Sequence, residues 1–272
     1  MKRIFPATKH TGRVASRSLM NTNPSRGQEA AAHQPAFDPA GEPEFDAVAD
    51  EYEALHSENV RASGYSTAYF AEYKVREVAD YLAGRGRAGQ ELAVLNFGCG
   101  IGNTEGFLRR HLPAAVIYGV DVSPRSIAHA QSRHRDLAGV HFSVYDGETL
   151  PWNFAFDVIF VANVLHHVPR PEHVAMLRML RGSLRPGGTL FLFEHNPWNP
   201  VTVRAVKTCA FDRGAVLLSP RYARRILAQA GFRWCGLRFT LFFPKLLAAL
   251  HPLEKFLRKV PLGAQYYLIA ED

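Results

Sequence analysis

Long hydrophobic runs are missing from this sequence. None of its 272 residues belongs to an apolar stretch of about 18 or more, the length that a membrane-spanning helix requires. The first residues also lack the continuous apolar segment of a secretory signal peptide. We therefore predict a cytoplasmic protein without a spanning helix.

Cysteine is scarce as well. The three cysteines, Cys99, Cys209 and Cys235, match no metal-binding spacing and cannot all pair within one chain. This usage is typical of a reducing compartment. We expect no metal site.

The net charge of +7 is distributed unevenly along the chain. Residues 1–36 contain six Lys or Arg, one acid and little apolar periodicity, which predicts a disordered basic tail, with an organelle transit peptide as the alternative. Residues 37–200 are acidic overall, whereas residues 201–272 are basic. An enzyme that acts on nucleic acid concentrates positive charge around its active site, so we expect no specific nucleic-acid partner.

A glycine-rich turn is the most informative local feature. Three apolar residues and Asn96 lead into a Gly98-x-Gly100-x-Gly102 turn, and a helix-like segment follows from Thr104 to His111. Glycine accepts positive φ and lets a ligand lie against bare backbone, where the first N–H groups of the next helix point at it. The pattern predicts a buried strand that ends at a ligand site.

Further strand-like runs alternate with helix-like segments downstream. They span residues 116–121, 140–145, 156–161 and 189–193. This alternation predicts an α/β fold with a parallel sheet, whose ligand site lies at the carboxyl ends of the strands. Four candidate residues fall at such ends: Gly98, Asp121, Asp146 and Asn163. A carboxylate at the position of Asp121 can accept from both hydroxyls of a ribose.

The turn itself narrows the choice of nucleotide. Dinucleotide dehydrogenases favour Gly-x-Gly-x-x-Gly, whereas this turn is Gly-x-Gly-x-Gly followed by Asn103. No Arg or Lys in the turn or the first helical turn is placed to pair with a pyrophosphate, because Arg109 and Arg110 come too late. The pattern favours S-adenosylmethionine and disfavours a nicotinamide cofactor.

With these motifs the chain resembles the class I S-adenosylmethionine-dependent methyltransferases, from about Phe45 to the C-terminus and most strongly between Val94 and Phe193. The resemblance implies a Rossmann-like α/β fold with helices on both faces of a seven-stranded sheet. Strand-like runs at 232–243 and 265–270 match the family's final strand pair, in which the last strand is antiparallel between its neighbours. Residues 194–197 and 261–267 look like bacterial methyltransferases of small-molecule, glycan or lipid pathways.

The resemblance also implies which residues bind S-adenosylmethionine. The glycine turn would wrap the methionine part of the cofactor. The acid after the second strand would bind the ribose, and the acid after the third strand would contact the adenine. Where the family usually has an acid two residues before the first glycine, this chain has Asn96, which predicts lower affinity or an amine bound through water. The implied set is Asn96, Gly98, Cys99, Gly100, Gly102, Asp121, Val122, Asp146, Gly147 and Asn163.

The acceptor side is assigned to three variable segments around a core at 91–272. We expect a helical lid over residues 37–90, including Tyr52 as a substrate residue, and insertions at about 196–219 and 244–263, with Asn196 as a second substrate residue. Residues 244–263 are amphipathic with bases on their polar positions, which is typical of a pocket-covering helix. The bases leave shallow contact with an anionic membrane as an alternative.

Three histidines are candidates for chemistry. His166 and His167 follow the fourth predicted strand and His195 ends the fifth, so each is a candidate general base, with helix capping or packing as the alternative. We expect methyl transfer to an O or N of a small or lipid-linked acceptor. The alternatives are an RNA or protein methyltransferase that uses the basic tail, and a cofactor-binding module without enzymatic activity.

Overall fold

The computed structural model describes residue 60, residues 63–209 and residues 214–272. The predicted basic tail, Tyr52 and most of the segment before residue 63 lie outside the described residues. The predictions for these parts of the chain therefore stay predictions.

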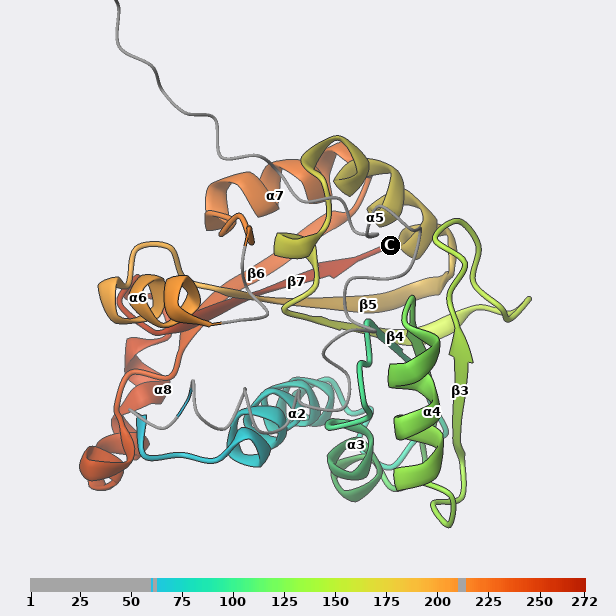
Figure 1. The fold of residues 1–272 in the computed structure, drawn as a ribbon, viewed down its shortest axis with the longest axis horizontal. Helices are drawn as coiled ribbons and strands as arrows, with labels where there is room; N and C mark the ends of the chain where they lie inside the picture. Colours follow the sequence, from blue (N-terminus) through green and yellow to red (C-terminus); the bar gives the residue numbers. More distant parts are fainter. Residues whose placement is uncertain (1–59, 61–62, 210–213) are drawn as a thin grey trace, which may run out of the picture. The chain divides into compact units, whose positions relative to one another are not determined.

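A seven-stranded sheet runs through the described part, with strand order β3-β2-β1-β4-β5-β7-β6 (Figure 1). The strands are β1 (Ala93–Phe97), β2 (Val116–Asp121), β3 (Val140–Val144), β4 (Phe156–Ala162), β5 (Leu184–His195), β6 (Arg233–Thr240) and β7 (Gln265–Glu271). The first five pair in parallel, and β7 is antiparallel to both β5 and β6. The predicted sheet, with its last strand antiparallel between two neighbours, is confirmed.

Two strands differ in extent from their predicted runs. Strand β5 begins at Leu184, before its predicted run of 189–193, and includes the Arg185–Gly188 stretch, where the pairing with β4 shifts register and Gly187 takes φ +74°. Such a bulge lets a turn-like sequence stay within a sheet. Strand β6 ends before its predicted limit, since Leu241 adopts φ +61°, a conformation that breaks a strand.

Helices cover both faces of the sheet (Figure 1). They are α2 (Thr67–Gly84), α3 (Glu105–His111), α4 (Pro124–Arg133), α5 (His173–Gly182), α6 (Pro200–Thr208), α7 (Pro220–Gln229) and α8 (Glu254–Leu257), with short 3-10 helices η3 (Leu165–His167), η4 (Arg170–Glu172) and η5 (Lys245–Leu253). Serine or asparagine caps the starts of α2, α4, α6 and α7 by accepting from a backbone N–H. Proline begins the last three of these, where its missing N–H has no cost.

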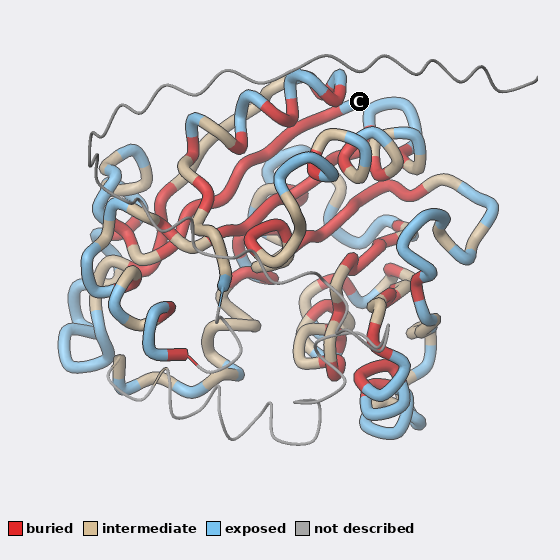
Figure 2. Tube along the Cα trace, turned by 45° about the horizontal axis from the view of Figure 1, so that its top comes forward, coloured by how far each residue is buried: buried red, intermediate tan, exposed pale blue. Residues whose placement is uncertain are grey.

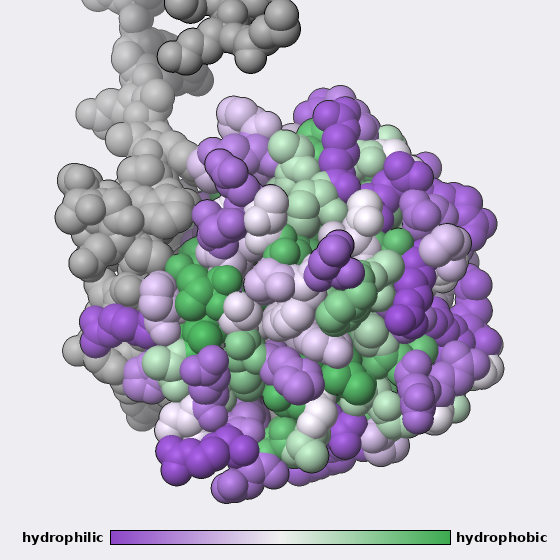
Figure 3. Space-filling model, turned by 90° about the vertical axis from the view of Figure 1, so that its right-hand side faces the viewer, coloured by the Kyte–Doolittle hydropathy of each residue, from purple (hydrophilic) through white to green (hydrophobic). Residues whose placement is uncertain are grey.

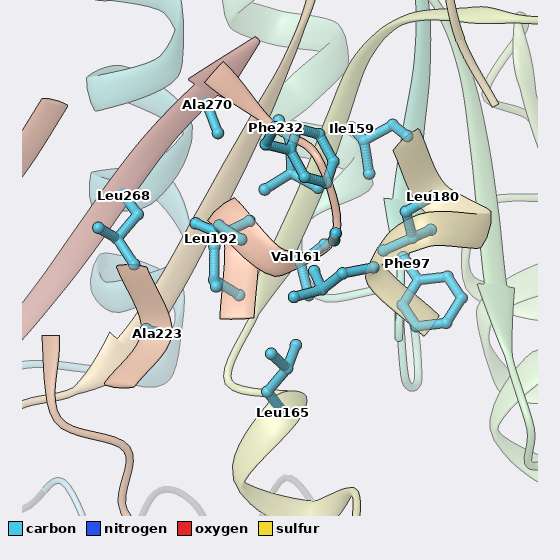
Figure 4. Close-up of a cluster of buried hydrophobic side chains, with 14 of the residues drawn as sticks. Phe97, Ile159, Val161, Leu165, Leu180, Leu192, Ala223, Phe232, Leu268 and Ala270 are labelled. Atoms are coloured by element: carbon cyan, nitrogen blue, oxygen red, sulfur yellow. The ribbon is translucent and has the colours of Figure 1, made fainter. Parts of the chain in front are cut away.

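The core consists of two hydrophobic clusters, one on each face of the sheet. One cluster joins the sheet to α5 and α7 and includes Leu165, Leu192 and Leu268, which point toward one another in Figure 4. The other joins the sheet to α2 and α3. Strands β1, β4, β5 and β7 are accordingly the most continuously buried part of the described chain, and they are largely red in Figure 2.

The insertion at 244–263 differs from the single amphipathic helix that its sequence suggests. It forms η5 and then α8. Within η5 the backbone is non-helical at Leu247, and the element also contains a proline, Pro252. Proline lacks the N–H that a continuing helix needs, so the segment breaks into short turns. No helix in the described ranges is both long and apolar enough to cross a membrane.

Candidate functional site

A cavity of about 890 Å³ opens at the carboxyl ends of β1, β4 and β5. Its walls come from the glycine turn after β1, the residues after β4, and one face of α2. Residues of α6 and of the segment after β6 complete it. The volume is in the range of small-molecule sites. Eight of the ten predicted cofactor residues line this cavity together with all three candidate histidines, and the exceptions are Gly102 and Asp146.

The glycine turn forms one wall for a steric reason. Gly98 takes φ +73°, and a Cβ there would overlap the side chain of Val164. The N–H groups of Gly98 and Cys99 donate to Val120 O at 2.8 and 2.9 Å, which ties the turn to β2. Gly100 takes φ +54° with nothing within 4 Å of its absent side chain, so its backbone faces open space. The turn is a cradle that only glycine permits at these positions.

Asp121, at the end of β2, connects the turn to the next helix. Its Oδ2 accepts from Gly100 N at 2.8 Å and its Oδ1 from Ser123 N at 3.0 Å. Ser123 in turn caps α4. These bonds orient the Asp121 carboxylate, which lines the cavity at the end of β2.

Asn96 has a partner that the sequence analysis does not identify. Its Nδ2 donates to Glu105 Oε1 at 2.7 Å, and both side chains are buried. Glu105 Oε2 accepts from Thr104 N at 3.2 Å. Burial raises the pKa of Glu105 to about 7, although these hydrogen bonds oppose the rise. The acid of the family motif is thus replaced by an amide with a buried carboxyl behind it.

Asp146 lies outside the cavity, although Gly147 lines it. The exposed Asp146 carboxylate accepts from the backbone N–H groups of Thr149 and Glu148 and from the Thr149 hydroxyl at 2.7 to 2.9 Å. These hydrogen bonds hold its pKa below the usual value. Its oxygens organise the turn after β3, so the adenine contact expected of Asp146 stays a prediction.

Asn163 combines backbone strain with an unsatisfied polar atom. It takes φ +58°, and its N–H donates to Phe193 O at 2.9 Å. Its buried Oδ1 has no hydrogen-bond partner among the described residues. Strained asparagines and orphaned buried acceptors are features of functional sites, because a ligand donor completes them. Asn163 lines the cavity, where its sequence position predicts it.

His166 is paired with a buried carboxylate, Glu194. The two side chains are 1% and 0% exposed, and His166 Nδ1 lies 2.6 Å from Glu194 Oε2. Because a carboxylate only accepts, Nδ1 is the protonated nitrogen and the basic lone pair of the neutral ring is on Nε2. Glu194 Oε1 accepts from Leu165 N at 3.0 Å, which orients the carboxylate itself. The arrangement is that of an oriented general base.

The other two histidines lie beside this pair. The ring centroids of His167 and His195 are 4.3 and 5.3 Å from that of His166, and both residues line the cavity. In the described part of the chain, no three His, Cys, Asp or Glu side chains are grouped as a metal site requires.

His173 stabilises the loop after β4 that carries His166. Its Nε2 donates to Leu165 O and Val168 O at 2.9 and 2.8 Å, and its Nδ1 lies 3.0 Å from the Tyr222 hydroxyl. Burial lowers the pKa of His173 and favours the neutral ring that this pattern needs. The 3-10 turn that presents His166 is therefore anchored to α5 and α7.

Asn196, predicted as a substrate residue, serves another purpose. It is fully buried, its Nδ2 donates to Pro261 O and Gly263 O at 3.1 and 2.7 Å, and its Oδ1 accepts from Trp198 N. These bonds join the end of β5 to the segment before β7. Asn196 is not among the residues that line the cavity, so a role toward the substrate stays a prediction.

Three buried charged side chains of the site are absent from the sequence analysis: Glu105, Glu194 and Lys74. Glu194 directly precedes His195 at a strand end, so alternation along the strand was an available signal. Glu105 and Lys74 lie on helices, where a charged residue usually faces solvent.

The site fits S-adenosylmethionine on its own geometry. The side-chain-free space at Gly100 admits a ligand against backbone, Asp121 offers acceptors to a diol, and the unsatisfied Asn163 Oδ1 requires a donor. These groups all line the same cavity.

Comparisons with known proteins agree with this geometry. Residues 94–188 match the model of a family described as a methyltransferase domain. Trans-aconitate 2-methyltransferase of Methylobacterium nodulans is 32% identical over 164 residues, which are 60% of this chain and 58% of the relative. Phthiotriol/phenolphthiotriol dimycocerosates methyltransferase of Mycobacterium leprae is 36% identical over 110 residues, 40% of this chain and 39% of the relative. The chain thus spans less than two thirds of either relative.

Solved structures show the same fold at low identity. Magnesium protoporphyrin IX methyltransferase from Synechocystis with bound SAH superimposes with a TM-score of 0.58 and 19% identity over 84% of this chain and 95% of that chain. A SAM-dependent methyltransferase from Archaeoglobus fulgidus gives a TM-score of 0.60 and 16% identity over 81% and 100%.

Proposed function

We propose that this chain is a class I S-adenosylmethionine-dependent methyltransferase that methylates a hydroxyl oxygen of a small or lipid-linked acceptor, on the basis of its methyltransferase domain match, its curated relatives and its fold. S-adenosylmethionine supplies a methyl group activated by its sulfonium. The cofactor residues are the glycine turn at 98–102, Asp121, Asn163 and Asn96 with Glu105 behind it. The acceptor occupies the part of the cavity toward α2, α6 and the histidines.

The His166–Glu194 pair is the observation that supports a hydroxyl acceptor. A hydroxyl oxygen is a poor nucleophile until its proton is removed, whereas a carboxylate or free amine needs no base. In the proposed reaction His166 Nε2 accepts the hydroxyl proton, and Glu194 keeps Nδ1 protonated and stabilises the imidazolium that forms. His166 is the proposed catalytic residue, and Glu194 is a positioning residue.

The relatives' names span both acceptor chemistries. Trans-aconitate is a carboxylate acceptor by name, and the Mycobacterium leprae relative is named for a lipid. A buried base paired with a glutamate has no task in carboxylate methylation. It favours the hydroxyl acceptor for this chain.

A lipid-linked acceptor is supported by the surface of the insertion after β6. Leu246, Leu250, Leu253 and Phe256 are 94, 36, 48 and 73% exposed, and Lys245, Lys255 and Lys259 of the same segment are also exposed. A segment that exposes both apolar side chains and lysines is suited to the interface of an anionic membrane. The segment begins next to Phe243 and Pro244, which line the cavity, so contact with a membrane would occur beside the acceptor site.

The proposed chemistry is tested by transfer of a labelled methyl group from S-adenosylmethionine to a panel of hydroxyl compounds. We expect H166Q to lower kcat by about 10²–10⁴-fold, the usual contribution of a general base, without changing the affinity for S-adenosylhomocysteine. H167Q is the matched control for a neighbouring cavity histidine. An H166Q enzyme with unchanged kcat would exclude His166 as the base.

The glutamate provides the second arm of the same test. E194Q still accepts from Leu165 N, but its amide cannot stabilise an imidazolium, so we expect a lower kcat and a shifted pH–rate profile at unchanged KM for the cofactor. Methylation of carboxylates alone, with no effect of either variant, would replace the hydroxyl acceptor with a carboxylate one.

A further inference from the structure

Lys74 presents a buried ammonium group to the acceptor side of the cavity. It belongs to the face of α2 that lines the cavity, together with Thr67, Phe70 and Ala71. These four positions follow helical spacing, so they form one continuous stripe. The other three members are small, hydroxylic or aromatic, and Lys74 alone carries charge.

The ammonium of Lys74 is poorly satisfied by the protein. The residue is only 7% exposed, and within the described ranges Nζ makes one long hydrogen bond, 3.4 Å to Phe70 O. An ammonium has three donors and loses much of its hydration when buried. A buried cation with unused donors at a cavity wall is a site for an anion or another strong acceptor.

The charge of Lys74 is attracted by the Glu194 carboxylate, but no hydrogen bond or ion pair joins the two side chains in the described part of the chain. This attraction partly opposes the effect of burial, which lowers the pKa of Lys74 to about 8. Both Glu194 oxygens are already engaged, by Leu165 N and by His166 Nδ1. Lys74 therefore remains charged near pH 7 without a direct ion pair among the described residues.

We propose that Lys74 binds a carboxylate or phosphate group of the acceptor, so that the substrate is a hydroxyl compound with a nearby anionic group. The identification of the bound molecule as the methyl acceptor rests on the proposed function, whereas the anion site itself does not. Lysine is a point charge with rotatable donors and suits either anion, whereas arginine would demand bidentate geometry. In this arrangement Lys74 orients the acceptor and His166 accepts its hydroxyl proton.

Gln265 adds a second polar group to the same cavity. Its side chain is buried, and its Oε1 has no hydrogen-bond partner in the described part of the chain. A largely apolar cavity with a few unsatisfied polar groups is the usual form of a specific small-molecule site. These groups indicate a polar acceptor head rather than a purely hydrocarbon one.

The anion site is tested first without turnover, on the full chain saturated with S-adenosylhomocysteine. The titration of the Lys74 side chain is followed by NMR of 13C-labelled lysine, with assignment from K74M, while acetate or inorganic phosphate is added. We expect saturable binding that raises the pKa of Lys74 by at least one unit, because a bound anion favours the charged form. The exposed Lys255 is the control and should not shift.

Either anion raising the pKa supports the site, and the one that binds at lower concentration identifies its class. No selective shift of Lys74 with both anions would overturn the proposal. This readout does not depend on catalysis, so it separates the anion site from the proposed methyl transfer.

Turnover provides the second test, with matched pairs of acceptors that differ only in charge. We expect hydroxy acids or hydroxyalkyl phosphates to be methylated in preference to their neutral methyl esters or diols. K74M should raise KM for the charged acceptor at least tenfold, with little change in kcat or in S-adenosylhomocysteine affinity, and K74R should recover part of the loss. Equal use of neutral and charged acceptors would also overturn the proposal. A selective Lys74 shift without any methyl transfer would instead refute the proposed function alone.

Discussion

Asn96 donates to the buried carboxyl of Glu105 across 2.7 Å, although the two residues lie on different elements, β1 and α3. In the methyltransferases that this chain resembles, the residue two positions before the first glycine of the turn is usually an acid. Here Asn96 lines the cavity, whereas its acidic partner Glu105 does not. The pair keeps a carboxyl group next to the cavity wall, linked to it by the Asn96 amide.

The raised pKa of Glu105 predicts a pH dependence of stability. Between its ordinary pKa and about 7, folded Glu105 keeps a proton that the unfolded chain releases, so stability falls as pH rises through this window and levels off above it. The effect amounts to at most about 3 kcal/mol, from about 1.4 kcal/mol per pKa unit. Urea unfolding at pH 4.5 to 8 checks it. E105Q should lose this part of the slope, and an identical slope in E105Q would contradict the assignment.

Restoring the family's acid should be harmful in this chain. N96D places two carboxyl groups at hydrogen-bond distance in a buried site, where they must share a proton. We expect a loss of about 2–4 kcal/mol in unfolding free energy at pH 8 and weaker S-adenosylhomocysteine binding by calorimetry. N96D/E105Q exchanges the two groups and should recover most of both losses. Tighter binding by N96D alone would mean that Glu105 is not the partner that matters.

Asp121 is expected to be the largest single contributor to cofactor affinity. D121A removes the acceptor for Gly100 N and the acceptors proposed for the ribose, which should cost about 2–3 kcal/mol of S-adenosylhomocysteine binding. D121N retains an acceptor and should lose less. Calorimetry measures both, with circular dichroism to establish that the variants are folded. An unchanged Kd for D121A would exclude Asp121 from the ribose site.

Two glycines with similar backbone angles separate strain from steric overlap. Gly98 and Gly86 take φ +73° and +70°, but a Cβ at Gly98 overlaps Val164, whereas Gly86 has nothing within 4 Å. G86A should lose about 1–2 kcal/mol of stability, the cost of left-handed backbone, and G98A about 1–3 kcal/mol more. V164A should relieve only the additional part. Equal losses in G98A and G86A would show that the overlap is unimportant.

The exposed apolar and lysine side chains of residues 244–263 predict reversible membrane binding. The full chain should co-sediment with vesicles that contain anionic lipid and much less with zwitterionic ones. L246S/F256S should reduce binding at least tenfold, because these are the most exposed apolar side chains of the segment. V144S is the matched control, since Val144 is 42% exposed on β3 at the opposite edge of the sheet, where hydrophilic and hydrophobic side chains are intermixed (Figure 3). Equal binding by both variants would remove the membrane contact.

The sequence alone determined the fold and most of the cofactor wall. The glycine turn, the polar strand ends at Asp121 and Asn163, and the alternation of elements are local patterns, and the parallel sheet places strand ends at one edge. The division of residues 244–263 into η5 and α8 is not predicted, because the amphipathic pattern suggests one helix.

Only the tertiary structure decided which buried groups work together. His166 and Glu194 are 28 residues apart, Asn96 and Glu105 nine, and Lys74 reaches the cavity from a helix that precedes the whole sheet. Periodicity indicates which face of an element is buried, but it does not say which polar side chain meets which across two elements. Asn196 illustrates the same limit, because backbone carbonyls at 261 and 263 occupy the amide that its sequence position assigned to a substrate. Pairing in a closed core depends on the packing of distant segments, and that is where the proposed base and anion site of this protein are defined.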